Sequence, residues 1–203
     1  MHLEILVEEP SAKEALDIIV RRILGRTHSF VVHPFNGKPD LLKKLPNRLR
    51  GYRHYINENM RIVVLIDADE GSCLALKRKL DCIAHSVGLT TKTDNCASCH
   101  IMNRIVVKEL EAWFWGDIYA MNRAYPRIPV GLVNKSKYRN PDAIGGGTYE
   151  ALEREFKRYR IFTAGLPKRE VAKNIAMHML PERNTSPSFK AFVCGLQDIC
   201  QIS

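Results

Sequence analysis

The pattern of apolar and polar residues predicts an alternation of strands and helices along the first half of the chain. Residues 3–7 alternate and are rich in aliphatic side chains, so we expect a strand that ends at Glu8. Apolar residues then recur at helical spacing over residues 15–24, and Ser11 with Glu14 has the spacing of a capping box. The first predicted unit is therefore a strand followed by a helix.

The same alternation continues to about residue 88. Residues 28–35 predict a second strand, and residues 40–56 predict helical pieces broken near Pro46. Residues 61–66 form a continuous aliphatic run, which is typical of a strand buried on both faces. The amphipathic stretch that follows predicts a helix with four inward positions, which are Leu74, Leu76, Leu80 and Ile83.

The second half predicts one more strand and then mostly helices. Residues 101–107 favour a strand, and residues 108–121 favour one helix in which Trp113 and Trp115 pack into the core rather than stack on bases. Prolines and glycines mark residues 125–147 as loop-rich, and helices are expected from there onward.

Strands that alternate with helices predict the α/β class, with a Rossmann-like, mainly parallel sheet flanked by helices. We expect a single domain over residues 1–203. Its core would lie at about residues 1–120, and residues 121–203 would form a helical C-terminal elaboration.

Composition is ordinary for a globular protein, at 45% hydrophobic and 26% charged residues. The strongest apolar run, residues 62–66, is far too short to span a bilayer, and the acidic start "MHLEILVEEPS" is unlike a signal peptide. We therefore expect a cytoplasmic protein without membrane contact, in which the six cysteines are free thiols.

The formal net charge of +9 predicts a positive field that attracts a polyanion. The basic residues are concentrated in two stretches, 38–61 and 123–173. A solvated basic face is the simpler interpretation, and contact with the phosphates of DNA or RNA, tRNA included, is the functional one.

Three carboxylates, Asp67, Asp69 and Glu70, follow the aliphatic run, and Glu8 follows the first strand. Ligands of parallel α/β sheets bind outside the carboxyl ends of the strands, so these acids are expected to meet at one edge. On an extended segment Asp67 and Asp69 would point the same way. Because like charges repel, such a cluster suits a hard cation such as Mg²⁺.

The combination of a glutamate motif, "LVEEPSA", and an acidic motif, "LIDADEG", resembles the Toprim domain of topoisomerases, primases and certain nucleases. In that domain the two motifs form a magnesium site. The chain is also similar over nearly its whole length to a Toprim-like bacterial family labelled domain of unknown function 4276. The matching stretches are "LVEEPSAKEAL", "HPFNGKPDLL", "DADEGSCLALKRKL", "NRIVVKELEAWFWGD", "KYRNPDAI" and "HMLPERNTSPSF".

The resemblance implies a nuclease that depends on Mg²⁺ or Mn²⁺ and hydrolyses phosphodiester bonds. Asp67 and Asp69 would ligate the metal, Glu8 would ligate it or act as general acid or base, and Glu111 is a further catalytic candidate. Related Toprim-type nucleases often work with an AAA- or ABC-type ATPase in defence against phage. This chain has no Walker motif, so a partner protein would supply the ATPase.

Two departures from the Toprim pattern keep a second hypothesis open. Glu9 follows Glu8 where many Toprim domains have glycine, and Gly71 stands where a third acid is common. Glu70 or Glu111 would then complete the ligand set, and the number of metal ions stays open. The alternative is a non-catalytic Toprim-like module that binds nucleic acid or regulates an ATPase. The oligomeric state also stays open, a homo-oligomer included.

Other motifs favour structural roles. "CASCH", residues 96–100, has the C-x-x-C-H pattern, but haem attachment follows export, and zinc would need two more ligands. Glycines 145–147 before Thr148 favour a turn with a threonine cap over a phosphate-binding loop, since no lysine follows. A phosphatase with Asp67 as nucleophile is disfavoured, because the D-x-D is not on the first strand.

Overall fold

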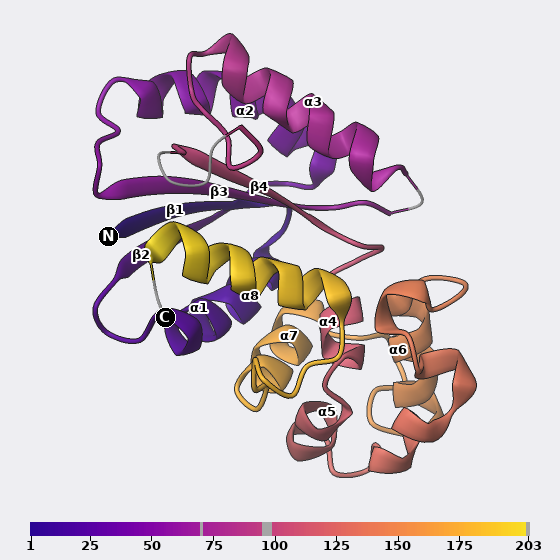
Figure 1. Cartoon of the computed structure of the whole chain (residues 1–203). Helices are drawn as coiled ribbons and strands as arrows, with labels where there is room; N and C mark the ends of the chain where they lie inside the picture. The colour runs from indigo at the N-terminus through magenta and orange to yellow at the C-terminus, as the bar shows by residue number, and fades with distance from the viewer. Residues whose placement is uncertain (70, 95–98, 202–203) are drawn as a thin grey trace.

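A parallel sheet of four strands lies between two layers of helices in the computed structural model, which describes residues 1–69, 71–94 and 99–201 (Figure 1). The strand order is β2-β1-β3-β4. The strands are β1 (His2–Val7), β2 (Ser29–Pro34), β3 (Met60–Asp67) and β4 (Ile101–Val106). All three neighbouring pairs run parallel, so the α/β class with a parallel, Rossmann-like sheet is confirmed.

The register of the sheet places the four carboxyl ends at one edge. Val7 pairs with Pro34 on one side and with Leu65 on the other, and Asp67 pairs with Val106. Parallel strands need crossover connections, and the helices between β1 and β2, between β2 and β3 and between β3 and β4 supply them. The residues after β1, β3 and β4 therefore emerge next to one another.

Two helices cover each face of the sheet. Helices α2 (Lys38–Arg53) and α3 (Cys73–Ser86) lie above it in Figure 1, and α1 (Pro10–Leu24) and α8 (Pro187–Cys200) lie below it. The interior is correspondingly split into two apolar clusters. Leu6, Ile62 and Val64 face α2 and α3, whereas Leu3, Ile5 and Val63 face α1 and α8. Strands buried on both faces explain the continuous aliphatic run of β3.

The remaining helices gather beyond the carboxyl ends of the strands, at the lower right of Figure 1. They are α4 (Glu111–Trp115), α5 (Ile118–Ala124), α6 (Thr148–Arg158) and α7 (Lys168–Ala176), with the short 3-10 helices η1 (Val130–Asn134), η2 (Ser136–Tyr138) and η3 (Pro141–Ala143). Helix α8 returns to pack on α1 and β4. The division expected near residue 120 stays a prediction.

Residues 180–188 hold α4 and α5 in place. Asn184 donates to the carbonyl of Trp113 (2.8 Å), and the Trp113 indole donates to Ser188 Oγ (3.0 Å). Buried Asp117 caps α5, and its carboxylate accepts hydrogen bonds from Nε and one Nη of Arg183 (2.7 and 2.9 Å). Trp113 and Trp115 are buried, as the sequence predicts. Residues 111–117 and residues 178–189, which are far apart in the sequence, thus pack together as one unit.

Three expectations about local structure were wrong. Helix α2 continues through Pro46 instead of breaking there, because buried leucines on either side of the proline hold the helix against the sheet. Residues 108–121 contain two short helices, since α4 ends with Gly116 as its C-cap and Asp117 caps the start of α5. Leu74, expected inside, is 58% exposed. Tertiary packing decided each case.

The predicted capping box at the start of α1 is also absent. Glu9 is the N-cap residue, Pro10 is the first residue of the helix, and Ser11 donates to the Glu9 carboxylate (2.6 Å). Proline suits this first position, because the N–H that it lacks would have no helical partner there. Glu14 pairs instead with Arg169 of α7 (2.6 Å).

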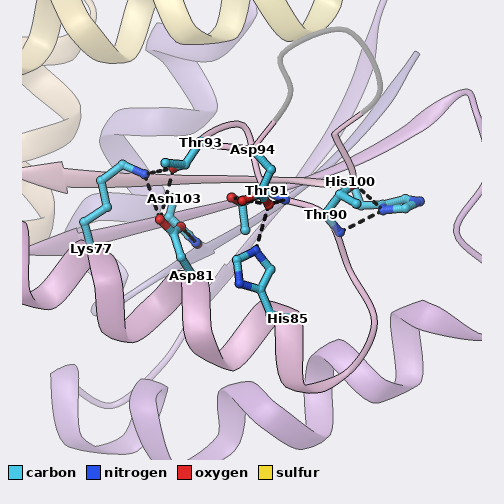
Figure 2. A network of polar contacts seen from close by, with 9 residues as sticks. All are labelled: Lys77, Asp81, His85, Thr90, Thr91, Thr93, Asp94, His100 and Asn103. Carbon is cyan, nitrogen blue, oxygen red and sulfur yellow. Dashed lines mark hydrogen bonds and ion pairs between the residues drawn. The ribbon is translucent and has the colours of Figure 1, made fainter.

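Polar contacts fasten residues 90–94 between α3 and β4 (Figure 2). Buried Asp81 of α3 accepts from Asn103 of β4 (2.7 Å), Thr93 (3.0 Å) and Lys77 (3.2 Å). Asp94 accepts from the N–H of Thr91 (2.8 Å), from its hydroxyl and from the ring of His85. These bonds lower the pKa of Asp94 to about 2.

Across the part of the chain that the structure describes, no helix combines the length and apolarity that a bilayer crossing requires.

Candidate functional site

Six acidic side chains among the described residues lie at the carboxyl edge of the sheet, and we call them the carboxylate cluster. Three elements contribute: the residues after β1, the end of β3 with its turn, and the residues after β4. The members are Glu8, Glu9, Asp67, Asp69, Glu109 and Glu111. Sequence analysis predicted four of them, which are Glu8, Asp67, Asp69 and Glu111. The fold brings these four within electrostatic range of one another around Asp67.

Glu8 and Asp67 are joined by a direct contact. The Asp67 N–H donates to Glu8 Oε1 (2.7 Å) just past the last backbone pairing of β1 with β3. Pro10 prevents β1 from extending, so a side-chain oxygen replaces the next backbone acceptor. Burial and the nearby acids raise the pKa of Glu8, whereas its contact with Asp67 and the charge of Lys38 lower it. One carboxylate oxygen of Glu8 thus has a fixed position.

Asp69 lies at the exposed side of the cluster. Its backbone lies in the left-handed region, with φ of 53°, so the expectation of an extended D-x-D segment was wrong. Asp69 tolerates this conformation better than most residues would. Its N–H donates to the Lys108 carbonyl (2.9 Å), and its exposed carboxylate pairs with Lys38 (2.6 Å). Asp67 and Asp69 therefore lie in different surroundings.

Lys38 reaches Asp69 because the chain after β2 is tied to the chain after β1. The Gly37 N–H donates to the Glu8 carbonyl (2.8 Å), and Gly37 has φ of 89°, which favours glycine. Lys38 is then the first residue of α2, where it pairs with Asp69 and its charge also acts on Glu8. It supplies a positive charge at one side of the cluster.

Lys168, the first residue of α7, supplies a positive charge at the other side. Its ammonium lies 3.9 Å from Glu9 and 4.4 Å from the centre of the Tyr149 ring. Burial lowers the pKa of Lys168, but Glu111, Glu9 and Glu109 outweigh this effect and raise it. The lysine therefore stays protonated and faces both Glu9 and Glu111.

Asp67 and Glu111 are the two members of the carboxylate cluster whose pKa values are raised most. Burial raises the pKa of Asp67 well above its usual range, and the charges of Glu8 and Glu111 raise it further. Burial also raises the pKa of Glu111 to about 7, against the charge of Lys168. Each carboxylate thus holds a proton more readily than a free side chain does, or requires a cation to stay ionised.

Glu109 has a structural partner of its own. One oxygen of its carboxylate accepts the N–H groups of Thr148 and Tyr149 (2.9 Å each) and the Thr148 hydroxyl (2.8 Å). Gly147 is the N-cap of α6, so the expected threonine cap was wrong and Glu109 takes that role. A cavity of about 280 Å³ lies beside it, lined by Asp69, Lys108, Glu109, Gly146, Gly147 and Glu150.

The cluster suits a divalent cation by its chemistry. Its donors are carboxylate oxygens, which Mg²⁺ and Mn²⁺ prefer, and Asp67 has a strongly raised pKa that a cation would relieve. Within residues 1–69, 71–94 and 99–201, no set of three or more His, Cys, Asp or Glu side chains is arranged to hold a metal. Mg²⁺ is commonly held by only one or two carboxylates together with substrate phosphates, which is fewer protein ligands than such a set contains.

Four residues of the site, Lys38, Lys168, Glu9 and Glu109, are not indicated by the sequence pattern. Glu9 was visible as the neighbour of Glu8, but the two lysines resemble many others in the linear pattern and gain meaning only from the fold. Glu70, an expected metal ligand, and Cys96 of the "CASCH" stretch lie outside the described residues. Cys99 is buried, and His100 accepts the Thr90 N–H at Nδ1 (3.1 Å). The described cysteines are free thiols.

The comparisons with known proteins place the chain in a family. The sequence model of the family described as Domain of unknown function (DUF4276) matches residues 7–197, so the chain belongs to this family. No curated protein and no solved structure matches the chain.

Proposed function

We propose that this member of the DUF4276 family is a metal-dependent nuclease of the Toprim type that hydrolyses phosphodiester bonds in DNA or RNA. The observation that carries the proposal is the contact between Glu8 and Asp67 at the carboxyl edge of a parallel sheet, with the pKa of Asp67 raised well above its usual range. Ligands of such sheets bind at this edge. The resemblance of both acidic motifs to those of Toprim nucleases supports it.

Glu8 and Asp67 would hold Mg²⁺ or Mn²⁺ through their carboxylate oxygens. A cation bound there would supply Lewis-acid polarisation of the scissile phosphodiester. Asp69 would join the ligands when its pairing with Lys38 is exchanged for substrate contacts, and Glu70 is a further proposed ligand. Lys38 and Lys168 flank the cluster and would attract the phosphate backbone from two sides.

Glu111 is the proposed proton carrier. A group that donates and accepts protons near neutral pH works best when its pKa lies near that pH. The pKa of Glu111 is about 7, because the side chain is buried among other acids. Lys168 faces it and keeps its pKa from rising further. Glu111 would thus exchange a proton during hydrolysis without leaving its place in α4.

The basic surface suits a nucleic-acid partner, tRNA included, and the resemblance suggests a separate AAA- or ABC-type ATPase in phage defence. A second candidate function is a non-catalytic nucleic-acid-binding or regulatory subunit of such a complex. The position of Asp69, paired with Lys38 and outside the pair of Glu8 and Asp67, favours this alternative. The two candidates differ in whether the isolated chain cleaves.

The test is incubation of the purified chain with plasmid DNA and total RNA in Mg²⁺, Mn²⁺ or EDTA. We expect metal-dependent cleavage that Asp67→Asn and Glu8→Gln each reduce at least a hundredfold. Asp17→Asn, an exposed carboxylate on α1, is the matched control and should cleave as the wild type does. Tight nucleic-acid binding without cleavage, also with an ATPase partner added, would favour the non-catalytic alternative.

A further inference from the structure

We propose that one side of α2 binds single-stranded nucleic acid, with Arg48 contacting a phosphate and Tyr55 stacking on a base. We call this region the α2 surface; its members are Lys43, Lys44, Asn47, Arg48, Arg50 and Tyr55. The inference rests on the proposed function, since it identifies the polymer's strand state and the path by which it approaches the carboxylate cluster.

Charge is the first observation. Helix α2 carries Asp40 as its single acid against six bases, which are Lys38, Lys43, Lys44, Arg48, Arg50 and Arg53. Lys38 pairs with Asp69 and Lys44 with Asp40. Among the described residues, no carboxylate forms an ion pair with the other four bases. Within the described part of the chain, most of this charge is thus without a carboxylate in an ion pair.

A cavity of about 500 Å³ lies beside Arg48, between α2 and the edge of the sheet. Its lining residues are Glu4, His33, Asn47, Arg48, Gly51, Tyr52 and Tyr55. The one acid there is already occupied: Glu4 accepts from His2 (3.0 Å), from Tyr52 (2.9 Å) and from His33. Arg48 contacts the Tyr52 oxygen and His33 Nδ1 (3.2 Å each), neither of which belongs to a carboxylate. A positive group is therefore held at the cavity wall.

Two tyrosines at the end of α2 provide the aromatic part. Tyr52 is buried, and the Arg48 guanidinium lies 5.3 Å from its ring centre. Tyr55 meets the Tyr52 ring edge to face at 5.8 Å but remains 58% exposed. Tyr55 is thus oriented by one aromatic neighbour while most of its own surface stays in solvent. Cationic groups beside an exposed aromatic ring are what proteins use to bind single strands.

The α2 surface is continuous with the carboxylate cluster. The helix begins at Lys38, which pairs with Asp69, and its 16 residues span about 24 Å at 1.5 Å per residue. A single strand with one base on Tyr55 and one phosphate on Arg48 would follow the helix toward Lys38. In a duplex the bases are stacked within the helix and inaccessible to Tyr55. The α2 surface should therefore bind single-stranded nucleic acid in preference to a duplex.

The experiment measures fluorescence anisotropy of labelled oligonucleotides in EDTA, where a metal-dependent nuclease cannot cleave. Single-stranded DNA, single-stranded RNA of the same sequence and duplex DNA are titrated with the wild type, Tyr55→Ala and Tyr55→Phe. We expect Tyr55→Ala to weaken single-strand binding about tenfold and Tyr55→Phe to restore it, because one stacked base contributes roughly that factor. Duplex binding should change less than twofold.

Tyr119→Ala is the matched control. Tyr119 is 49% exposed, and Arg183 lies 5.5 Å from its ring centre, so it reproduces the arrangement away from α2. The proposal is overturned if Tyr55→Ala and Tyr119→Ala bind alike, or if the wild type binds no single strand. Because binding is measured without metal, the α2 surface and the proposed nuclease activity can fail separately. If Tyr55→Ala weakens binding but the wild type does not cleave, only the nuclease proposal is overturned. If cleavage depends on Asp67 but Tyr55→Ala binds as the wild type does, only the α2 surface is overturned.

Discussion

At the scale of single residues, the two lysines at the carboxyl edge approach the outer carboxylates. Lys38 contacts Asp69 and Lys168 approaches Glu9, whereas Asp67 forms no ion pair with any described residue. Four other acids raise its pKa in addition to burial. A partly buried carboxylate among so many other acids requires a proton or a cation. The residue with the least compensated charge is thus the one that best suits a metal.

Asp94 provides a pH test of the contacts in Figure 2. Hydrogen bonds from Thr91 and His85 lower its pKa to about 2, from an ordinary value of 3.8. A carboxylate with a lowered pKa adds stability above about pH 4 and loses that contribution as the pH falls toward 2. We expect Asp94→Asn to melt below the wild type at pH 6, with a difference that stays nearly constant down to about pH 4 and then shrinks toward pH 3.

The measurement is the melting temperature of both proteins from pH 7 to pH 3. Asp17→Asn is the control, because Asp17 is about as exposed as Asp94 and, among the described residues, forms an ion pair only with Lys13 of its own helix. Surface pairs of that kind contribute little, so its melting temperature should follow the wild type throughout. A difference between Asp94→Asn and the wild type that stays constant down to pH 3 would contradict the assignment of the lowered pKa to these bonds.

At the scale of elements, the sequence predicts those strands and helices that depend on a local pattern of apolar and polar residues. The four strands follow from their aliphatic runs, and the positions of Glu8 and Asp67 follow because the runs of β1 and β3 end in acids. The unbroken α2 and the split between α4 and α5 do not, since they depend on packing against the sheet and on Asp117. Lys38 and Lys168 could not be assigned to the site either, because no local pattern shows which basic residues the fold directs toward it.

Pro46 offers a test of how tertiary packing overrides local preference. A proline inside a helix removes one backbone hydrogen bond and crowds the preceding turn. Leu45 and Leu49 on either side are fully buried and hold the helix in place. We expect Pro46→Ala to raise the free energy of unfolding by roughly 1–3 kcal/mol, as measured by urea denaturation.

Pro39→Ala in the same helix is the matched control. Pro39 lies in the first turn, where a missing N–H removes no helical bond, so no comparable gain is expected. If Pro46→Ala lowered stability instead, the ring of Pro46 would contribute packing that exceeds its cost to the helix. In that case the continuity of α2 would depend on the proline itself.

At the scale of the whole molecule, a net charge of +9 either acts as a diffuse field or is focused on one surface. The two cases differ in how salt weakens binding. Each phosphate neutralised on a single strand contributes about −0.7 to the slope of log K against log salt. If three or four bases of the α2 surface contact phosphates, the wild-type slope should lie between about −2 and −3.

A pair of double variants separates the diffuse field from the focused surface. Lys43→Gln with Arg50→Gln removes two exposed bases of the α2 surface, and Arg123→Gln with Arg154→Gln removes two exposed bases of α5 and α6. The net charge changes equally in both. For a focused surface, the first variant should reduce the magnitude of the slope by about 1.4 and the second should leave it unchanged. Equal changes in both variants would mean that the charge acts as a diffuse field, because a field of that kind depends on total charge and not on its position.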